Sequence, residues 1–234
     1  MEILEIRYCF HLAGQGSKIF EVRLDGRSLE RLNGLDRNFP AWTALPTQQC
    51  PHCPLTVAIH PHCPVATSLA EVIERFEDVI SYDAIDLEVI TAGRRVSQHT
   101  TAQRGLSSLF GLLIATSGCP HTTFFKPMAR FHLPLASEED TIFRAAGMYL
   151  LAQYFLRREG RESDPDLTGL KRIYDNLHLV NIRLANRIRS ATRTDSTINA
   201  LVLLDTFTNL MPYVIEEHLI NIRHLFDSYL PDSV

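Results

Sequence analysis

Hydrophobic and polar residues alternate at the start of the chain and again after residue 83. The segments EILEIRYCFHL and SKIFEVRLDG are separated by the glycine-containing AGQGS, which predicts a β-hairpin. The later segment AIDLEVITAGRRVSQHT predicts a second hairpin that turns at Ala92 and Gly93. Because side chains of a strand point alternately to its two faces, Cys9 and His11 share the more polar face of the first strand. There we expect a part-buried structural thiol rather than a ligand.

A helical period replaces the alternation in other segments. SLAEVIERFEDVI predicts an amphipathic helix with Ser68 as N-cap and Glu71 completing a capping box. TAQRGLSSLFGLLIAT predicts a helix that ends just before Cys119. Ser137 and Asp140 predict the start of a helix over 138–158, which EGRESDPD ends. Three further helices are expected near 166–191, 195–210 and 213–230.

This order of elements predicts an α+β fold. Antiparallel hairpins and a loop over 33–64, rich in Cys, His and Pro, come first, and a C-terminal α-helical bundle follows. We expect an α+β part over 1–135 and a helical part over 136–234, packed on the first part or on a second copy. A seam of apolar residues in the last helix predicts packing, and with it a homodimer through the C-terminal helices: Ile215, Leu219, Ile222, Phe226 and Tyr229.

Composition narrows the class of protein. The chain has 234 residues, 45% of them hydrophobic and 21% charged, which is typical of a globular protein. A net charge of −4 gives no reason to expect nucleic acid, and the basic segment RIRSATR reads as an ordinary helix C-terminus. No segment approaches the roughly 20 apolar residues of a membrane helix. MEILEIRYCF carries acidic residues where a signal peptide is basic, which predicts a cytoplasmic protein.

Four cysteines have the spacing C-x2-C-x9-C-x55-C. In a reducing compartment, clustered cysteines are metal ligands or redox groups more often than disulfides. Thiolates from one loop and one distant segment can complete a tetrahedron around zinc. The bound zinc would also stabilise the loop, which has few apolar residues to bury. The spacing therefore predicts a structural zinc site formed by Cys50, Cys53, Cys63 and Cys119.

Two alternatives stay open for the same thiols. A proline follows each of the four cysteines, and Cys-Pro is familiar beside iron–sulfur ligands, so a [4Fe–4S] cluster in a redox or sensor protein, or an enzyme, is the second reading. The sequence CPHC at 50–53 is also that of an oxidising thiol–disulfide site. That chemistry needs the first cysteine at the start of a helix, whereas Pro54 and an irregular segment follow here.

Histidines accompany the cysteines. They could replace a thiolate, bind a second ion or hydrogen-bond the sulfur atoms from an outer shell: His52, His60, His62 and His121. A complete Walker spacing and a G-x-S-x-G motif are both absent from the sequence. We therefore expect a metal-binding interaction or regulatory module rather than an enzyme, with no catalytic residue assigned.

Several short phrases resemble an uncharacterised bacterial family, a domain of unknown function. They are spread over most of the chain: CPHCPL, HPHCPVA, TTAQRGLSSL, ATSGCPH, ARFHLPLA, MYLLAQYF and NALVLLD. The resemblance implies a recurring Cys-Pro framework and so a metal-site role for the four cysteines. It implies no reaction or substrate, and His52 is not part of the shared framework.

Overall fold

The computed structural model describes residues 2–34, 38–191 and 195–230, and only the backbone at residues 207, 210–214, 216 and 218. Its elements are β1 (Ile3–Leu12), β2 (Gly16–Asp25), η1 (Ala41–Thr43), α1 (Pro64–Arg75), β3 (Ala84–Thr91), β4 (Arg95–Thr101), α2 (Ala102–Ala115), η2 (Thr123–Phe125), α3 (Lys126–Arg130), α4 (Glu138–Arg158), α5 (Thr168–Ala191), α6 (Asp195–Asn221) and η3 (Arg223–Tyr229). The fold is α+β, as predicted.

The two predicted hairpins form and join into one antiparallel sheet with the strand order β2-β1-β3-β4. Tyr8 of β1 lies opposite Phe20 of β2 and Val89 of β3. These three side chains belong to the buried face of the sheet, because alternate residues share a face. Cys9 points to the other face, where it is also buried, at 6% exposure.

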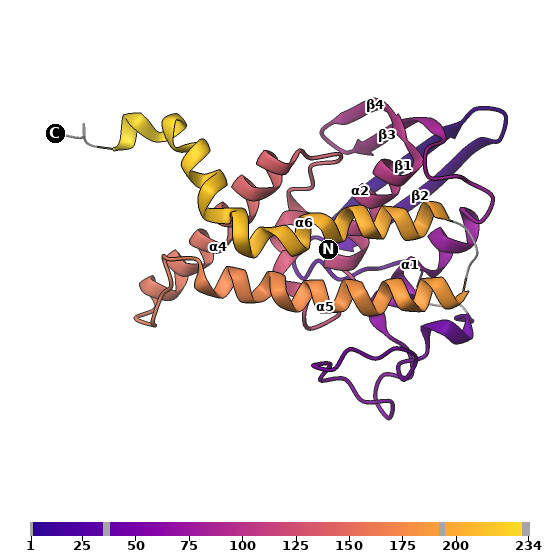
Figure 1. Ribbon diagram of the computed structural model, residues 1–234, viewed down its shortest axis with the longest axis horizontal. Coiled ribbons are helices and arrows are strands. Elements are labelled where there is room, and N and C mark those ends of the chain that lie inside the picture. The colour runs from indigo at the N-terminus through magenta and orange to yellow at the C-terminus, as the bar shows by residue number, and fades with distance from the viewer. Residues whose placement is uncertain (1, 35–37, 192–194, 231–234) are drawn as a thin grey trace.

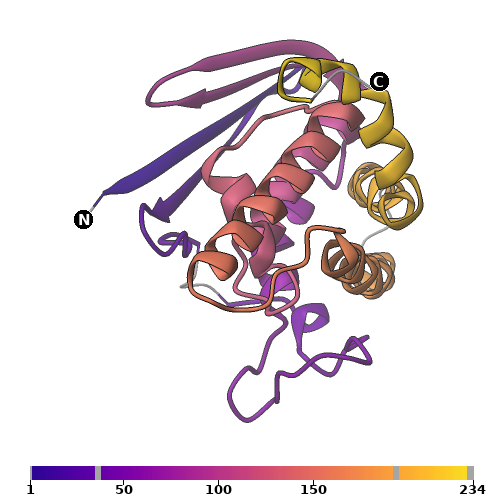
Figure 2. The ribbon, with the colours of Figure 1, turned by 90° about the vertical axis from the view of Figure 1, so that its left-hand side faces the viewer.

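Helices cover only one face of the sheet. Figure 2 shows the sheet as an outer layer, then a middle layer containing α2, then the antiparallel pair α5 and α6. Gly105 allows α2 to approach the sheet closely, since a Cβ there would lie 2.9 Å from Ile85 Cδ1 and 2.9 Å from Phe10 Cε1. Phe10 also packs edge-on against Phe76, with ring centroids 5.0 Å apart.

The predicted start of α4 is confirmed. The Asp140 N–H donates to Ser137 Oγ at 3.0 Å, and the Ser137 N–H donates to Asp140 Oδ2 at 2.9 Å. This reciprocal capping box satisfies two backbone donors that a helix start leaves without partners. Figure 1 shows α4 and η3 at the end of the molecule remote from α1.

Two predicted helix boundaries are wrong. Helix α1 begins at Pro64 with Cys63 as its N-cap, and Ser68 lies inside the helix, where its hydroxyl donates to the Pro64 carbonyl at 2.8 Å. Proline is favoured in the first turn because its missing N–H has no partner to lose there. Helix α6 continues to Asn221 where we predicted a break near residue 211, and η3 forms the remaining segment.

The division at residues 135 and 136 stays a prediction. One continuous buried cluster includes Phe10 and Leu109 from the first part and Leu170 and Leu201 from the second. No helix within the described residues has both the length and the apolar character needed to cross a bilayer.

Candidate metal centre

The loop that carries three of the cysteines is closed at its base by backbone pairing. The Leu45 N–H donates to the Pro61 carbonyl at 2.9 Å, and the Cys63 N–H donates to the Thr43 carbonyl at 2.8 Å. Thr43 is fully buried, and its hydroxyl both donates to the Pro40 carbonyl and meets His62 Nδ1 at 2.8 Å. The base of the loop is therefore ordered, and Cys63 stands at its junction with α1.

Arg187 of α5 fixes this base to the helical layer. Its guanidinium donates to the carbonyl oxygens of Trp42, Ala44 and Leu45 at 3.1, 2.6 and 2.8 Å. The side chain is buried, at 2% exposure, with no carboxylate partner among the described residues. Arg187 is the first residue of the segment that we interpreted as a basic helix end, so sequence reasoning missed its role. The sequence contained one indication that Arg187 is buried: it follows Leu184 by one helical turn and so lies on the same face of α5.

Cys50 and Cys53 lie at the two ends of a tight turn. The Cys53 N–H donates to the Cys50 carbonyl at 3.1 Å, which makes Pro51 and His52 the central residues of a β-turn. Proline suits the first central position because its φ is already near the required value. The turn brings the two cysteines close together.

Cys119 is held in a second turn, directly after α2. Its N–H donates to Ser117 Oγ at 3.2 Å, and its carbonyl accepts from the Thr122 N–H at 3.0 Å. The backbone N–H of His121 donates to the Cys119 sulfur, which offsets part of the increase that burial causes in the pKa of this thiol. Pro120 has no N–H to offer, and the donor comes instead from the residue that follows it.

The two turns are joined directly. His121 Nε2 lies 2.9 Å from the His52 carbonyl oxygen, and the two imidazole rings have centroids 4.0 Å apart. Because a carbonyl can only accept, His121 carries its proton on Nε2. Both ring nitrogens of His52 are buried without a well-aligned hydrogen-bond partner among the described residues, and burial lowers the pKa of this histidine, although the Asn176 backbone offsets this in part. Burying polar atoms without partners is costly.

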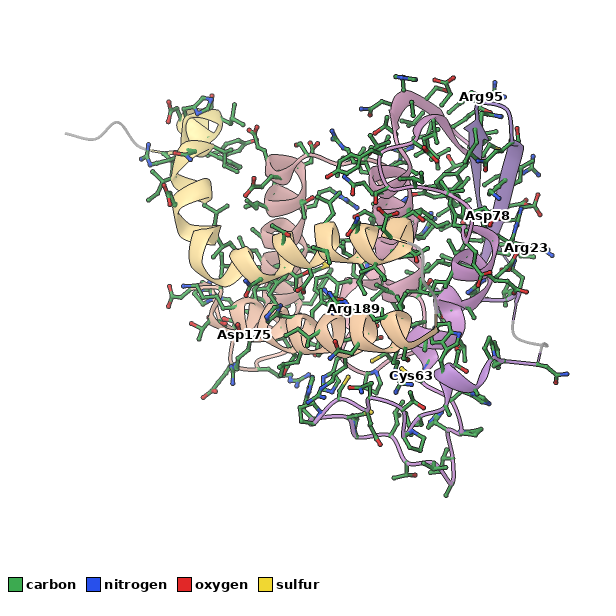
Figure 3. All side chains as sticks on the ribbon, turned by 45° about the vertical axis from the view of Figure 1, so that its right-hand side comes forward. Arg23, Cys63, Asp78, Arg95, Asp175 and Arg189 are labelled. Carbon is green, nitrogen blue, oxygen red and sulfur yellow. The ribbon has the colours of Figure 1, made fainter. Side chains whose placement is uncertain are left out.

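The four predicted thiols influence one another electrostatically. Burial, helped by the charges of Cys63, Cys50 and Cys53, raises the pKa of Cys119 to about 12. Burial also raises the pKa of Cys50 to about 11, helped by Cys63 and Cys53, although Arg187 opposes this. Figure 3 shows sulfur atoms gathered around the labelled Cys63, below α5.

These thiols do not form a finished coordination sphere. Among the described residues, which include all five cysteines, no three Cys, His, Asp or Glu side chains are arranged to hold one ion. All five cysteines are free thiols, and Cys9 stands apart on the sheet. The donor chemistry nevertheless fits zinc, because Cys50, Cys53 and Cys119 lie in two short turns that contact each other, and Cys63 adds a fourth soft sulfur ligand at the base of the same loop.

The four predicted histidines have different environments. His52 and His121 contact each other between the two turns. His62 is hydrogen-bonded to Thr43 at the loop base, and its ring lies 5.4 Å from that of Phe39. His60 is exposed near the tip of the loop, and none of the described residues hydrogen-bonds its side chain.

The fold and the cysteine arrangement define an α+β protein with a cysteine-rich loop fixed against its helical layer. A family model described as Domain of unknown function (DUF6901) matches residues 6–227. The match covers most of the chain, which therefore belongs to this family. No match was found among curated proteins or among solved structures.

Proposed function

We propose that Cys50, Cys53, Cys63 and Cys119 bind one zinc ion with a structural role, and that the protein is an interaction module. The hydrogen bond from His121 to the His52 carbonyl carries this proposal, because it joins two Cys-Pro turns that are 69 residues apart in the chain. When bound, zinc would supply a cross-link between the loop and the end of α2.

The composition of the loop supports a bound cation. Val57 and Ile59 near its tip are exposed, so the loop buries little apolar surface to offset the entropy of ordering. Burial raises the pKa of the Cys50 and Cys119 thiols, and a divalent cation would favour their ionised forms by binding them. Cys63 is the N-cap of α1, where free backbone N–H groups favour negative charge.

Metal analysis tests this proposal. We expect about one zinc per chain in protein purified without oxygen, and loss of that zinc in Cys119→Ser. The matched control is Cys9→Ala, which removes a buried thiol on the sheet and keeps the metal. Chelation should lower the free energy of unfolding, by about 4 kcal/mol where free zinc is a thousand times its Kd.

Other results of these measurements would contradict the zinc proposal or favour one of the two alternatives. A metal-free protein that is equally stable with and without chelator contradicts the proposal. Iron in place of zinc, with a brown colour and absorbance near ~400 nm, would assign the [4Fe–4S] alternative. Insulin reduction that needs Cys50 but no metal would assign thiol–disulfide exchange. Thiol–disulfide exchange is the less favoured alternative, because Cys50 lies in a β-turn and not at the start of a helix.

We also propose that the interaction is with a second copy of the chain. Helix α4 exposes apolar side chains at spacings typical of a helix–helix contact: Phe143, Leu150, Leu151, Tyr154 and Phe155. η3 extends this surface, because Phe226 lies 6.4 Å from Phe143 between ring centroids. A helical stripe of this kind is complementary to the same stripe on an antiparallel copy, as a two-fold symmetric dimer requires.

A further inference from the structure

A cavity of about 390 Å³ lies where α2, α3, α4, α5 and α6 meet. Its volume is within the range of small-molecule sites in proteins. Apolar side chains form most of its wall, among them Leu112, Phe125, Leu177 and Leu203. None of the four cysteines lines it, so the cavity is separate from the metal centre.

The described part of the cavity wall carries positive charge. Arg104 and Arg144 line it, and none of the described Asp or Glu residues does. Arg144 is held by donation from Nη2 to the carbonyls of Met128 at 2.8 Å and Phe131 at 3.0 Å. Burial lowers the pKa of Arg144, the charge of Asp140 offsets this in part, and no described carboxylate forms an ion pair with Arg144. An anion in the cavity would stabilise this partly buried charge.

Tyr174 adds a donor without a partner. Its side chain is only 4% exposed and packs edge-on against Phe125, with centroids 5.3 Å apart. No described residue hydrogen-bonds its hydroxyl, although Tyr174 lines the cavity beside Arg144. Because Tyr174 lines the cavity, its hydroxyl is available to donate to an acceptor on a ligand.

His132 also lines the cavity and is held by a chain of hydrogen bonds. The Leu135 N–H donates to Ser108 Oγ at 3.0 Å, and Ser108 Oγ lies 2.9 Å from the Tyr8 hydroxyl. The Tyr8 hydroxyl in turn lies 2.5 Å from His132 Nε2. This chain fixes the imidazole ring in the cavity wall.

We propose that this cavity binds a small amphipathic carboxylate. Its apolar body lies among the leucine and phenylalanine side chains, and its carboxylate accepts hydrogen bonds from Arg144 and Tyr174, with Arg104 at the mouth. Arg104, Arg144 and Tyr174 offer donors, and no described carboxylate lines the cavity, which favours an acceptor-only head group. The proposal does not depend on the zinc centre.

Calorimetric titration of the full-length protein tests the proposal with three probes. Decanoate has both parts of the ligand, decanol lacks the charge, and acetate lacks the apolar body. We expect saturable decanoate binding with one site per chain, about tenfold or more tighter than decanol, because a charge-assisted hydrogen bond is lost. Acetate should not saturate. Absence of saturable decanoate binding, or equal affinity for decanol, overturns the proposal.

Variants separate the site from non-specific adsorption. Tyr174→Phe should weaken decanoate binding severalfold and leave the ligand-free protein at least as stable, because the hydroxyl has no partner to lose. Gly111→Leu should abolish binding by filling the cavity, since a Cβ at Gly111 meets only Leu204 Cδ1, at 4.0 Å. Arg158→Gln, at the exposed end of α4, is the matched charge control and should bind normally. Unchanged decanoate affinity in both Tyr174→Phe and a folded Gly111→Leu would also overturn the proposal.

Discussion

Proline residues decide how the thiols are presented. Pro51 occupies the first central position of the turn that brings Cys50 and Cys53 together. Pro120 removes the N–H next to Cys119, but the following residue, His121, supplies an N–H to the sulfur.

His132 is a single residue with a testable effect on stability. Burial, together with the charges of Arg144 and Arg94, lowers its pKa to about 3, whereas an unfolded histidine titrates near 6.5. As the pH falls below about 6.5, the unfolded chain takes up this proton and the folded chain does not. His132 therefore destabilises the fold progressively in acid, by up to about 1.4 kcal/mol per pH unit.

We expect His132→Gln to reduce this acid sensitivity. Glutamine can still accept the Tyr8 hydrogen bond, so the variant should fold at neutral pH. Urea unfolding between pH 7.5 and pH 4.5 should show a shallower loss of stability in the variant than in the parent protein. An equal loss of stability with falling pH in the two proteins would contradict the conclusion that His132 is buried in its neutral form.

At the scale of elements, the sequence pattern predicted which segments are helices more accurately than it predicted where each helix begins. Ser137 and Asp140 cap α4 as predicted, because their capping box is a contact within one turn. Ser68 and Glu71 offer a similar pattern, yet α1 starts five residues earlier, at Pro64 with Cys63 as its N-cap. Val65 and Ala66 in that first turn are buried in the core, and this packing favours the earlier start.

Two glycines inside helices should respond oppositely to substitution by alanine. Gly105→Ala should destabilise the fold by about 1–3 kcal/mol, because the new Cβ would lie 2.9 Å from both Ile85 and Phe10. Gly147→Ala in α4 meets nothing within 4 Å and should stabilise by about 0.5–1 kcal/mol through helix propensity. Urea unfolding measures both, and effects of the same sign would contradict the packing described for α2.

At the scale of the whole molecule, the predicted packing seam divides in two. Ile215 and Ile222 are buried against the chain itself, whereas Phe226 and Tyr229 are 38% and 85% exposed. The exposed part lies on η3, which adjoins the apolar surface of α4 through Phe226 and Phe143. The surface available for a homodimer is therefore formed by α4 and η3 together.

We expect the parent protein to be a dimer and the double variant Leu151→Glu, Phe155→Glu to be a monomer. Both side chains are 55% exposed on α4, so charges there should disrupt an interface without unfolding the chain. Sedimentation velocity measures the change, and Ile80→Glu, on the loop after α1, is the control for a charge at another exposed apolar site. A monomeric parent protein, or a double variant that still dimerises, would refute this surface as the interface.

Features that depend on residues close together in the sequence were predictable, and contacts between distant residues were not. The hairpins, α2, α4 and α5 follow from alternation, helical period and caps, which are all local. The candidate site was predictable in its residue types, since the cysteines and prolines are adjacent in the sequence. The role of Arg187 was not, because its partner carbonyls lie 142 to 145 residues away and nothing in the pattern of α5 indicates them.

The sequence by itself determined the elements and the set of thiols, because period, capping and residue type act over a few neighbouring residues. Only the tertiary structure decided that His121 meets His52, that Arg187 fixes the loop base, and that donors without partners surround a cavity between the helices. Those arrangements depend on how helices pack across the sheet. Packing depends on the shapes of many side chains at once, which no short segment of the chain contains.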